Sequence, residues 1–341
     1  MKQHRLTALV VVALVATVAA MASQAVAAPK SGTLTVYSGR EQEVVEGLFD
    51  QFEQATGIDV RVRYGESAEL AATLAEEGKA SPADVFFAQD AGSLGAVALG
   101  GRLAKLPASL LSRVDARYRD PAGRWVGTSG RARVIVYNTE LVKRSELPKS
   151  VFDLTRPRWQ GKVGFPPTNG SFQAFVTAMR VTAGEQRTKD WLRALKRNEA
   201  RSYDKNISVV EAVAAGEVEV GLVNHYYLYI VKKEQPKAPV ANLFLKSGDP
   251  GALVNVAGAG IVTGAKHSAE AKRFLAYLLS PAGQRYYNTA EEAEFPLVKG
   301  VSPRAGLPAL ASLQGPKVAL GVLGQELEQT LQLLSEVGFT S

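Results

Sequence analysis

The 341-residue chain contains no cysteine. This absence excludes disulfide bonds, thiolate metal sites, a cysteine nucleophile and a lipid-modified cysteine at a signal cleavage site. Histidine is nearly absent as well, since only His225 and His267 follow the first thirty residues. The chain also lacks a Walker loop, a Gly-x-Ser-x-Gly elbow and a histidine pair at metal-ligand spacing. These absences argue against an enzyme and against a zinc or copper site built from nitrogen and sulfur ligands.

Long apolar runs are missing after the first thirty residues. At the N-terminus, Lys2 and Arg5 precede an apolar run over 6–20, and small residues follow at 25–28. This order predicts a cleavable signal peptide over 1–28. The run is about 15 residues long, short of the roughly 20 that a membrane-spanning helix needs. We therefore expect a periplasmic mature protein that carries no lipid anchor.

The charge is only mildly positive. Forty Lys and Arg against 33 Asp and Glu give a formal charge of +7, which falls to +5 without Lys2 and Arg5. Basic residues are scattered among acidic ones, and only Lys232, Lys233 and Lys237 form a small cluster. No basic stripe alternates with aromatic residues, so we expect no nucleic-acid partner. The small excess favours an anionic ligand.

Short β-branched segments alternate with amphipathic helices along the chain, which predicts an α/β fold. Strands are expected near 34–37, 58–64, 84–87, 133–137, 162–165, 218–223 and 255–262, and helices near 41–54, 67–77, 172–182 and 268–279. Ser67 is the expected N-cap of the second helix, and Ser208 with Glu211 the expected capping box of a later one. Ligands of such folds gather where strands end and helices begin.

Five polar loops follow the predicted strands. They read Tyr37-Ser38-Gly39-Arg40-Glu41, then 81–90 with Pro-Ala-Asp-Val-Phe, Ser129-Gly130-Arg131-Ala132-Arg133, 166–172 with Pro-Pro-Thr-Asn-Gly-Ser-Phe, and Asn224-His225-Tyr226-Tyr227-Leu228-Tyr229. From about Thr33 to Val298, this set resembles the ferric-ion-binding proteins of bacterial ABC iron importers. The Asn-x-Tyr-Tyr element is its most specific part.

The resemblance implies a type II periplasmic-binding-protein fold. It consists of two α/β lobes, each a mixed sheet flanked by helices, joined by crossing strands near 133–137 and 253–257. The implied boundaries are 29–133 for the first part of lobe 1, 134–255 for lobe 2, 256–292 for the return to lobe 1, and 293–341 for the C-terminal helices, placed with lobe 2.

The resemblance also implies the cargo and its ligands. Ferric iron is a hard cation that suits anionic oxygen better than sulfur. A tyrosine has a pKa near 10, so a phenolate at neutral pH needs a strong cation beside it. By the family's pattern, Tyr226 and Tyr227 are the two phenolate ligands. The second tyrosine pair, Tyr286-Tyr287, follows Ser280-Pro281 in a predicted helix and is expected to be packing.

A small synergistic anion, carbonate or phosphate, often completes the site in this family. Asn169, Gly170 and Ser171 precede a predicted helix, whose N-terminus attracts anions. Arg131 lies where the family places an anion-holding arginine, and Asn206 matches a further polar position of the cleft. These five residues are the expected anion site.

The chain departs from the family in its first half. Several members supply a histidine and a glutamate there, and the matching positions hold Glu41 and Gln89, which we take as candidate metal ligands. The alternative is that the first lobe only closes over a metal held by the tyrosines, the anion and water. Other members add a tyrosine where this chain has Ser171 and Phe172. Further residues expected at the cleft are Ser38, Gly39, Arg40, Asp90 and Asn224.

The resulting hypothesis is a monomeric substrate-binding protein that captures ferric iron and delivers it to an ABC permease and its ATPase. The alternative within the same class is a binder of an oxyanion or small organic anion without metal, held by Arg131, the 169–171 loop and Asn206. A third is an interaction protein that reports its ligand state to a membrane kinase.

Overall fold

The computed structural model describes residues 32–288 and 293–340. The predicted signal segment, 1–28, lies outside these described residues. Within them, none of the helices combines the length and the apolar character that crossing a membrane requires.

Ten strands of the described chain form a connected sheet in the order β2-β1-β3-β9-β4-β7-β5-β6, with β8 and β10 also paired to β4. Their bounds are β1 Gly32–Ser38, β2 Ile58–Tyr64, β3 Val85–Ala88, β4 Val126–Asn138, β5 Val163–Phe165, β6 Arg201–Ser202, β7 Val220–Asn224, β8 Val240–Leu243, β9 Val254–Ile261 and β10 Phe295–Pro296.

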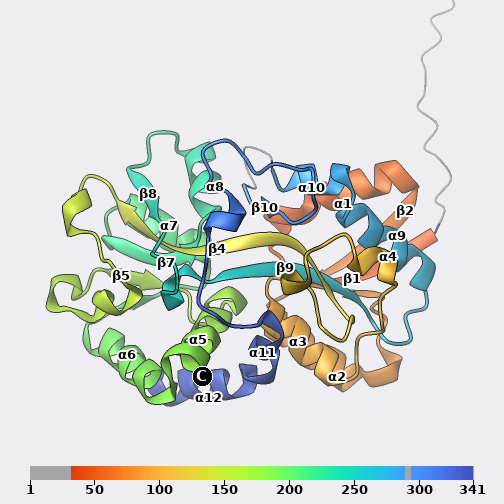
Figure 1. The fold of residues 1–341 in the computed structure, drawn as a ribbon, viewed down its shortest axis with the longest axis horizontal. Coiled ribbons are helices and arrows are strands. Elements are labelled where there is room, and N and C mark those ends of the chain that lie inside the picture. The colour runs from red at the N-terminus through yellow and green to blue at the C-terminus, as the bar shows by residue number, and fades with distance from the viewer. Residues whose placement is uncertain (1–31, 289–292, 341) are drawn as a thin grey trace, which may run out of the picture.

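Strand β4 changes partners part-way along its length and so joins the two halves of the molecule. Residues 126–132 of β4 pair antiparallel with β9, whereas residues 133–138 pair with β7 and β8. On one side of this point, β1 is parallel to β2 and β3, and β3 is antiparallel to β9. On the other side, β5 is parallel to β6 and β7. Each half is therefore a mixed sheet, which confirms the predicted fold class (Figure 1).

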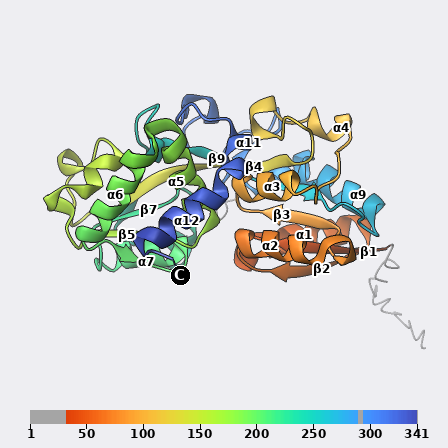
Figure 2. The same cartoon turned by 90° about the horizontal axis from the view of Figure 1, so that it is seen from below.

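Twelve α-helices surround the two sheets in the described ranges. They are α1 Gln42–Thr56, α2 Ser67–Glu77, α3 Ala91–Leu99, α4 Ala108–Leu111, α5 Gly170–Ala183, α6 Glu185–Arg197, α7 Asn206–Ala214, α8 Tyr227–Glu234, α9 Ser268–Leu278, α10 Pro281–Tyr286, α11 Leu320–Gln325 and α12 Leu327–Val337. Figures 1 and 2 show α1–α4, α9 and α10 around the half that contains β1–β3, which we call the first half. Helices α5–α8 surround the half that contains β5–β8, which we call the second half.

Each half has an aromatic core that fixes its helices on its sheet. In the first half, α1 turns Phe49 and Phe52 inward, and both rings contact Phe274 of α9 at centroid distances of 5.6 and 5.1 Å. In the second half, Phe175 of α5 contacts Trp191 of α6 edge-to-face at 5.8 Å. Aromatic pairs of this geometry add about 0.5–1.5 kcal/mol beyond the burial of their surface. The cleft loops are thus carried by rigid bodies.

Three local predictions were wrong. The strand expected at 133–137 begins earlier, at Val126, because the Gly-rich segment before it stays extended against β9. Ser67 is the first residue of α2 rather than its N-cap; its hydroxyl instead donates to the Gly39 carbonyl and accepts from the Gln89 amide. Ser208 lies inside α7, which already begins at Asn206, so it forms no capping box.

The two C-terminal helices contact different parts of the molecule. Helix α11 packs on α3 so closely that a Cβ added at Gly95 would lie 2.9 Å from the Gly324 Cα. Helix α12 packs on α5 and α6 of the second half (Figure 2). The lobe boundaries predicted from the sequence, including the placement of 293–341, stay a prediction.

Candidate functional site

The tyrosine pair lies between the end of β7, at Asn224, and the start of α8, at Tyr227. Tyr226 and Tyr227 are each only 1 % exposed, and their ring centroids are 4.2 Å apart with an interplanar angle of 30°. The short connection between strand and helix forces both rings inward, so two phenol oxygens come from one loop of the second half.

A carboxylate of the first half reaches this pair. The Tyr227 hydroxyl donates to Oε1 of Glu41, the residue just before α1, at 3.1 Å. Burial raises the pKa of Glu41 and of both phenols above their ordinary values. Both tyrosines are therefore protonated in the metal-free protein at neutral pH.

Arg131 is the cation beside the pair. Its guanidinium lies 5.6 Å from the ring centroid of Tyr226, and its Nη1 donates to the carbonyl of Gln89. Its Nε is 3.6 Å from Oε2 of Glu294. Its Nη2 is buried without a hydrogen-bond partner. A buried guanidinium donor left unpaired is costly, so an anion at this position would be stabilised.

Glu294 pairs with the two arginines that give the site its positive charge. It is fully buried, and it accepts hydrogen bonds from Arg40 and from the Ser129 hydroxyl while pairing with Arg131. Burial alone would raise the pKa of Glu294, but Arg40 and Arg131 outweigh that effect and lower it. The two arginines and one carboxylate together leave one net positive charge next to Tyr226.

The predicted anion loop forms the N-terminus of α5. Asn169 is the N-cap, and its Oδ1 accepts from the Ser171 amide at 3.1 Å and from the Ser171 hydroxyl at 2.7 Å. The helix thus begins at Gly170, two residues earlier than predicted. The amide and hydroxyl of Ser171 already have partners. Buried donors of Arg131 and of Arg133, whose Nη1 bonds to Asn224, have none.

Gln89 connects the first half to this loop. Its Oε1 lies 3.3 Å from Asn169 Nδ2 and 3.2 Å from the Ser171 hydroxyl. The Asn224 side chain donates to the same hydroxyl at 3.0 Å. The side-chain oxygen of Gln89 is therefore engaged with the second half, and its role as a metal ligand stays a prediction.

Asn206 is a further buried polar residue whose side chain has no hydrogen-bond partner. Its side chain is 0 % exposed, and neither its Oδ1 nor its Nδ2 has a hydrogen-bond partner. Its neighbours Lys205 and Ile207 line a groove of about 260 Å³ together with Glu41. A buried amide without partners is unfavourable unless a ligand completes it.

The remaining predicted cleft residues lie on loops at the strand ends. The Ser38 hydroxyl accepts from the Arg40 amide, the Gly39 carbonyl accepts from Ser67, and Asp90 caps α3 through the Ser93 amide at 2.8 Å. The halves touch here, since a Cβ at Gly170 would lie 2.7 Å from Oδ2 of Asp90. The sequence reasoning missed Glu294, and it assigned no cleft role to Arg133, whose Nη1 donates to the Asn224 side chain at 3.3 Å.

His225 is structural. The Ala132 amide donates to its Nδ1 at 3.3 Å, and its Nε2 donates to the Ala293 carbonyl at 2.8 Å. Its ring stacks on Phe295 at 4.7 Å. Burial lowers its pKa to about 4, so the ring is neutral and both nitrogens are occupied. It can serve neither as a general base nor as a metal ligand in this state.

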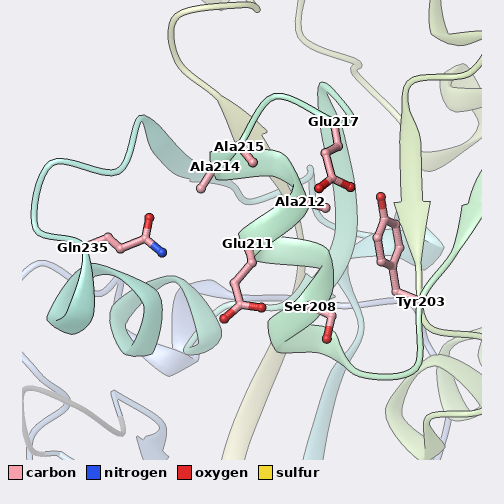
Figure 3. A pocket seen from close by; sticks show the side chains of 8 residues that line it. All are labelled: Tyr203, Ser208, Glu211, Ala212, Ala214, Ala215, Glu217 and Gln235. Atoms are coloured by element: carbon pink, nitrogen blue, oxygen red, sulfur yellow. The ribbon is translucent and has the colours of Figure 1, made fainter.

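No group of three or more His, Cys, Asp or Glu residues that could hold a metal occurs in the described ranges. A separate hollow of about 430 Å³ lies over α7, lined by Tyr203, Ser208, Glu211, Glu217 and Gln235 with three alanines (Figure 3). Neither tyrosine of the pair lines it, so it is not the site described above.

Two mixed α/β halves joined by β4 and β9, with polar loops meeting between them, define the class of type II periplasmic binding proteins. The model of the bacterial extracellular solute-binding protein family matches residues 80–312. The chain belongs to this family, and within it to the ferric-iron-binding periplasmic proteins. The resemblance expected from the loops is thereby confirmed.

Three relatives support this membership. The Fe(3+)-binding periplasmic protein of Serratia marcescens is 33% identical over 98% of both chains. Iron-bound HitA from Pseudomonas aeruginosa has a TM-score of 0.86 and 37% identity, covering 90% of this chain and 99% of that one. IdiA (FutA) of Trichodesmium, in complex with iron and citrate ligands, has a TM-score of 0.73 and 31% identity, covering 91% and 100%. These relatives are binding proteins, which agrees with the expectation of no enzymatic activity.

Proposed function

We propose that this protein captures ferric iron between its two halves and delivers it to an ABC permease driven by an ATPase. The observation that carries the proposal is a cluster of three oxygen groups: buried Tyr226 and Tyr227 lie side by side in one half, and the Tyr227 hydroxyl meets Glu41 of the other half at 3.1 Å. Hard, anionic oxygen ligands are those that ferric iron prefers. Two phenolates and one carboxylate carry three negative charges, which match the charge of the ion.

A small anion, carbonate or phosphate, completes the site in this proposal. Arg131 Nη2 and the amide of Asn206 are buried groups whose hydrogen bonds the protein does not satisfy. The N-terminus of α5, at Asn169, Gly170 and Ser171, adds a favourable field for negative charge. The net positive charge left by Arg40, Arg131 and Glu294 favours an anion beside the iron rather than a second cation.

Capture works by closure in this proposal. Iron first meets the tyrosine loop of the second half, and the first half then closes over it by a hinge at β4 and β9. The predicted lobes 29–133 with 256–292, and 134–255, are the bodies that move. The permease would recognise the closed monomer in the periplasm.

A visible absorption titration tests the proposal. Metal-free protein is titrated with ferric citrate in bicarbonate buffer, and we expect a phenolate-to-iron band that saturates at one iron per chain. The Tyr226→Phe, Tyr227→Phe double variant should lose the band. The matched control is the Tyr286→Phe, Tyr287→Phe double variant, which removes another adjacent pair and should keep it.

The absence of a band in wild-type protein would overturn the iron proposal. One observation favours the second candidate in that case: the unmet groups of Arg131 and Asn206 suit an oxyanion without any metal. Carbonate or phosphate would then raise the melting temperature of metal-free protein, and Asn206→Ala would abolish that increase.

A further inference from the structure

Glu66 is a carboxylate of the first half that has no assigned role. It immediately precedes α2 and has the extended backbone of an N-cap residue, yet its side chain makes no capping hydrogen bond. Its Oε2 is buried without a hydrogen-bond partner. A carboxylate normally accepts several hydrogen bonds, so a buried one left unpaired needs an explanation.

Its neighbours place Glu66 at the meeting point of the two halves. The next residue, Ser67, donates to the Gly39 carbonyl at 3.4 Å and accepts from the Gln89 amide at 3.1 Å. The Ser67 Cβ also faces the start of α5, at 3.6 Å from where a Cβ on Gly170 would lie. Glu66 therefore directly precedes a residue that contacts the loops of the site, and its own side chain is half-buried.

The charged residues that most affect Glu66 include Glu41 of the candidate site. Burial and the charge of Glu41 raise the pKa of Glu66 to about 7, whereas Lys205 opposes this rise. Asp90 and the exposed Glu69, which lies outside the site, contribute less to this rise. Glu41 in turn bonds to Tyr227. Two carboxylates of the first half, Glu41 with its phenol partner and Glu66 with an unpaired Oε2, therefore interact electrostatically with each other and with Lys205.

The second half also contains a buried polar side chain without hydrogen-bond partners. Asn206 is completely buried with both polar side-chain atoms unpartnered, and the residues on either side of it line the groove of Glu41. Lys205, directly before Asn206, is the cation that acts on both carboxylates. Unsatisfied polar groups on both halves of one site are what a ligand bound between them would complete.

We propose that Glu66 is a second carboxylate through which the first half binds the ferric cargo, alongside Glu41. This inference rests on the proposed iron capture and names the first-half ligands that the family's histidine and glutamate would otherwise supply. The pair Glu41 and Glu66 provides hard oxygen donors, which suit ferric iron better than a soft or neutral ligand set.

Competition titrations against nitrilotriacetate test the role of Glu66. We compare wild type, Glu66→Gln and the control Glu69→Gln, which neutralises an exposed residue of the same helix. Glu66→Gln should weaken ferric affinity on the order of 10–100-fold, the range typical for groups that support a bound metal. Glu69→Gln should stay within about twofold of wild type. Because Gln is nearly isosteric and removes a poorly solvated charge, Glu66→Gln should melt no lower than wild type.

The same titrations in added salt distinguish direct binding of iron by Glu66 from long-range electrostatic attraction between them. Long-range attraction between charges is largely screened at about 1 M salt, whereas direct binding is not. A loss of affinity in Glu66→Gln that persists at high salt supports the proposal. Equal affinities of the two variants, or a difference that disappears in salt, would refute it while leaving iron capture intact. A wild type that shows no phenolate band would overturn both.

Discussion

The Tyr227 hydroxyl and Glu41 form a hydrogen bond of 3.1 Å that joins the two halves of the molecule across the candidate site. Its two partners are 186 residues apart in the chain. A second link is formed by Gln89, whose side-chain oxygen meets Asn169 and Ser171. Polar side-chain contacts therefore hold the two halves together across the candidate site.

Removing the Glu41 contact should open the metal-free protein. Glu41→Ala deletes one of the few side-chain hydrogen bonds between the halves, each worth about 0.5–1.5 kcal/mol, so the open form gains population. We expect a larger radius of gyration by small-angle X-ray scattering for this variant than for wild type. Glu43→Ala, which changes an exposed residue of the same helix, should match wild type. Identical scattering from all three proteins would show that this bond does not hold the closed form.

Iron uptake should release protons from the tyrosines. Burial raises the pKa of both phenols, so both are protonated at pH 7 and must lose a proton to bind iron as phenolates. We expect each single variant, Tyr226→Phe or Tyr227→Phe, to release one proton fewer per iron than wild type. The measurement is a titration of weakly buffered protein with ferric nitrilotriacetate, followed by a pH indicator. Equal proton release from variants and wild type would mean that the phenols do not bind the metal.

Gly170→Ala should hinder the closure of the two halves without weakening the folding of either half. A Cβ at this position would lie 2.7 Å from Oδ2 of Asp90, so the two halves could not approach as they do here. Within its own half the substitution is compatible with α5, whose first residue is Gly170, since Ala is a better helix former than Gly. We expect weaker iron affinity together with an unchanged or higher melting temperature. A drop in both would point to damage within the second half instead.

The regular elements could be predicted from the sequence because each depends on its own residues. The helix expected at 268–279 is α9, Ser268–Leu278, and the one expected at 41–54 is α1, Gln42–Thr56. Apolar residues at helical spacing are enough for such predictions. The tyrosine loop was recognised through the family resemblance, because Asn224, Tyr226 and Tyr227 lie together in the chain.

Other parts of the site could not be predicted because they depend on distant partners. Glu294 pairs with Arg40, which lies 254 residues away in the sequence, and no local sequence pattern predicts that contact. The residue type of Ser67 predicted an N-cap, but its hydroxyl instead forms hydrogen bonds with backbone groups of two other loops. Glu66 gave no signal at all, since an acidic residue before a helix is ordinarily a solvated one. Tertiary contacts decided these residues, and only the folded arrangement shows them.

Glu294→Gln should be strongly destabilising. The substitution removes the only negative charge that the structure shows paired with Arg131, and it weakens the ion pair with Arg40. Breaking a buried ion pair from one side typically costs about 3–5 kcal/mol. The measurement is urea-induced unfolding of the metal-free protein. The control is Glu185→Gln, where the carboxylate that pairs with Arg180 is 55% exposed and surface pairs contribute about 0–1 kcal/mol. Similar losses of stability in the two variants would show that the buried ion pairs of Glu294 contribute no more than a surface pair.

Acid should destabilise the protein through His225. Its pKa is about 4 in the folded chain, against 6.5 for an ordinary histidine, because burial disfavours the charged ring. Between these values the unfolded chain binds a proton that the folded chain does not, so the free energy of unfolding falls as the pH falls from about 6.5 to about 4. From pH 7 to pH 5 this one group should remove about 2 kcal/mol.

Urea unfolding of wild type and His225→Gln at pH 7 and pH 5 checks this. The variant lacks the titrating ring, so its loss between the two pH values should be smaller than that of wild type by about 2 kcal/mol. Phe295→Leu is the matched control: it removes the ring that stacks on His225 and should lower stability at both pH values while keeping the wild-type difference. If His225→Gln loses as much stability in acid as wild type does, other groups cause the acid sensitivity and the neutral, buried state of His225 is not its source.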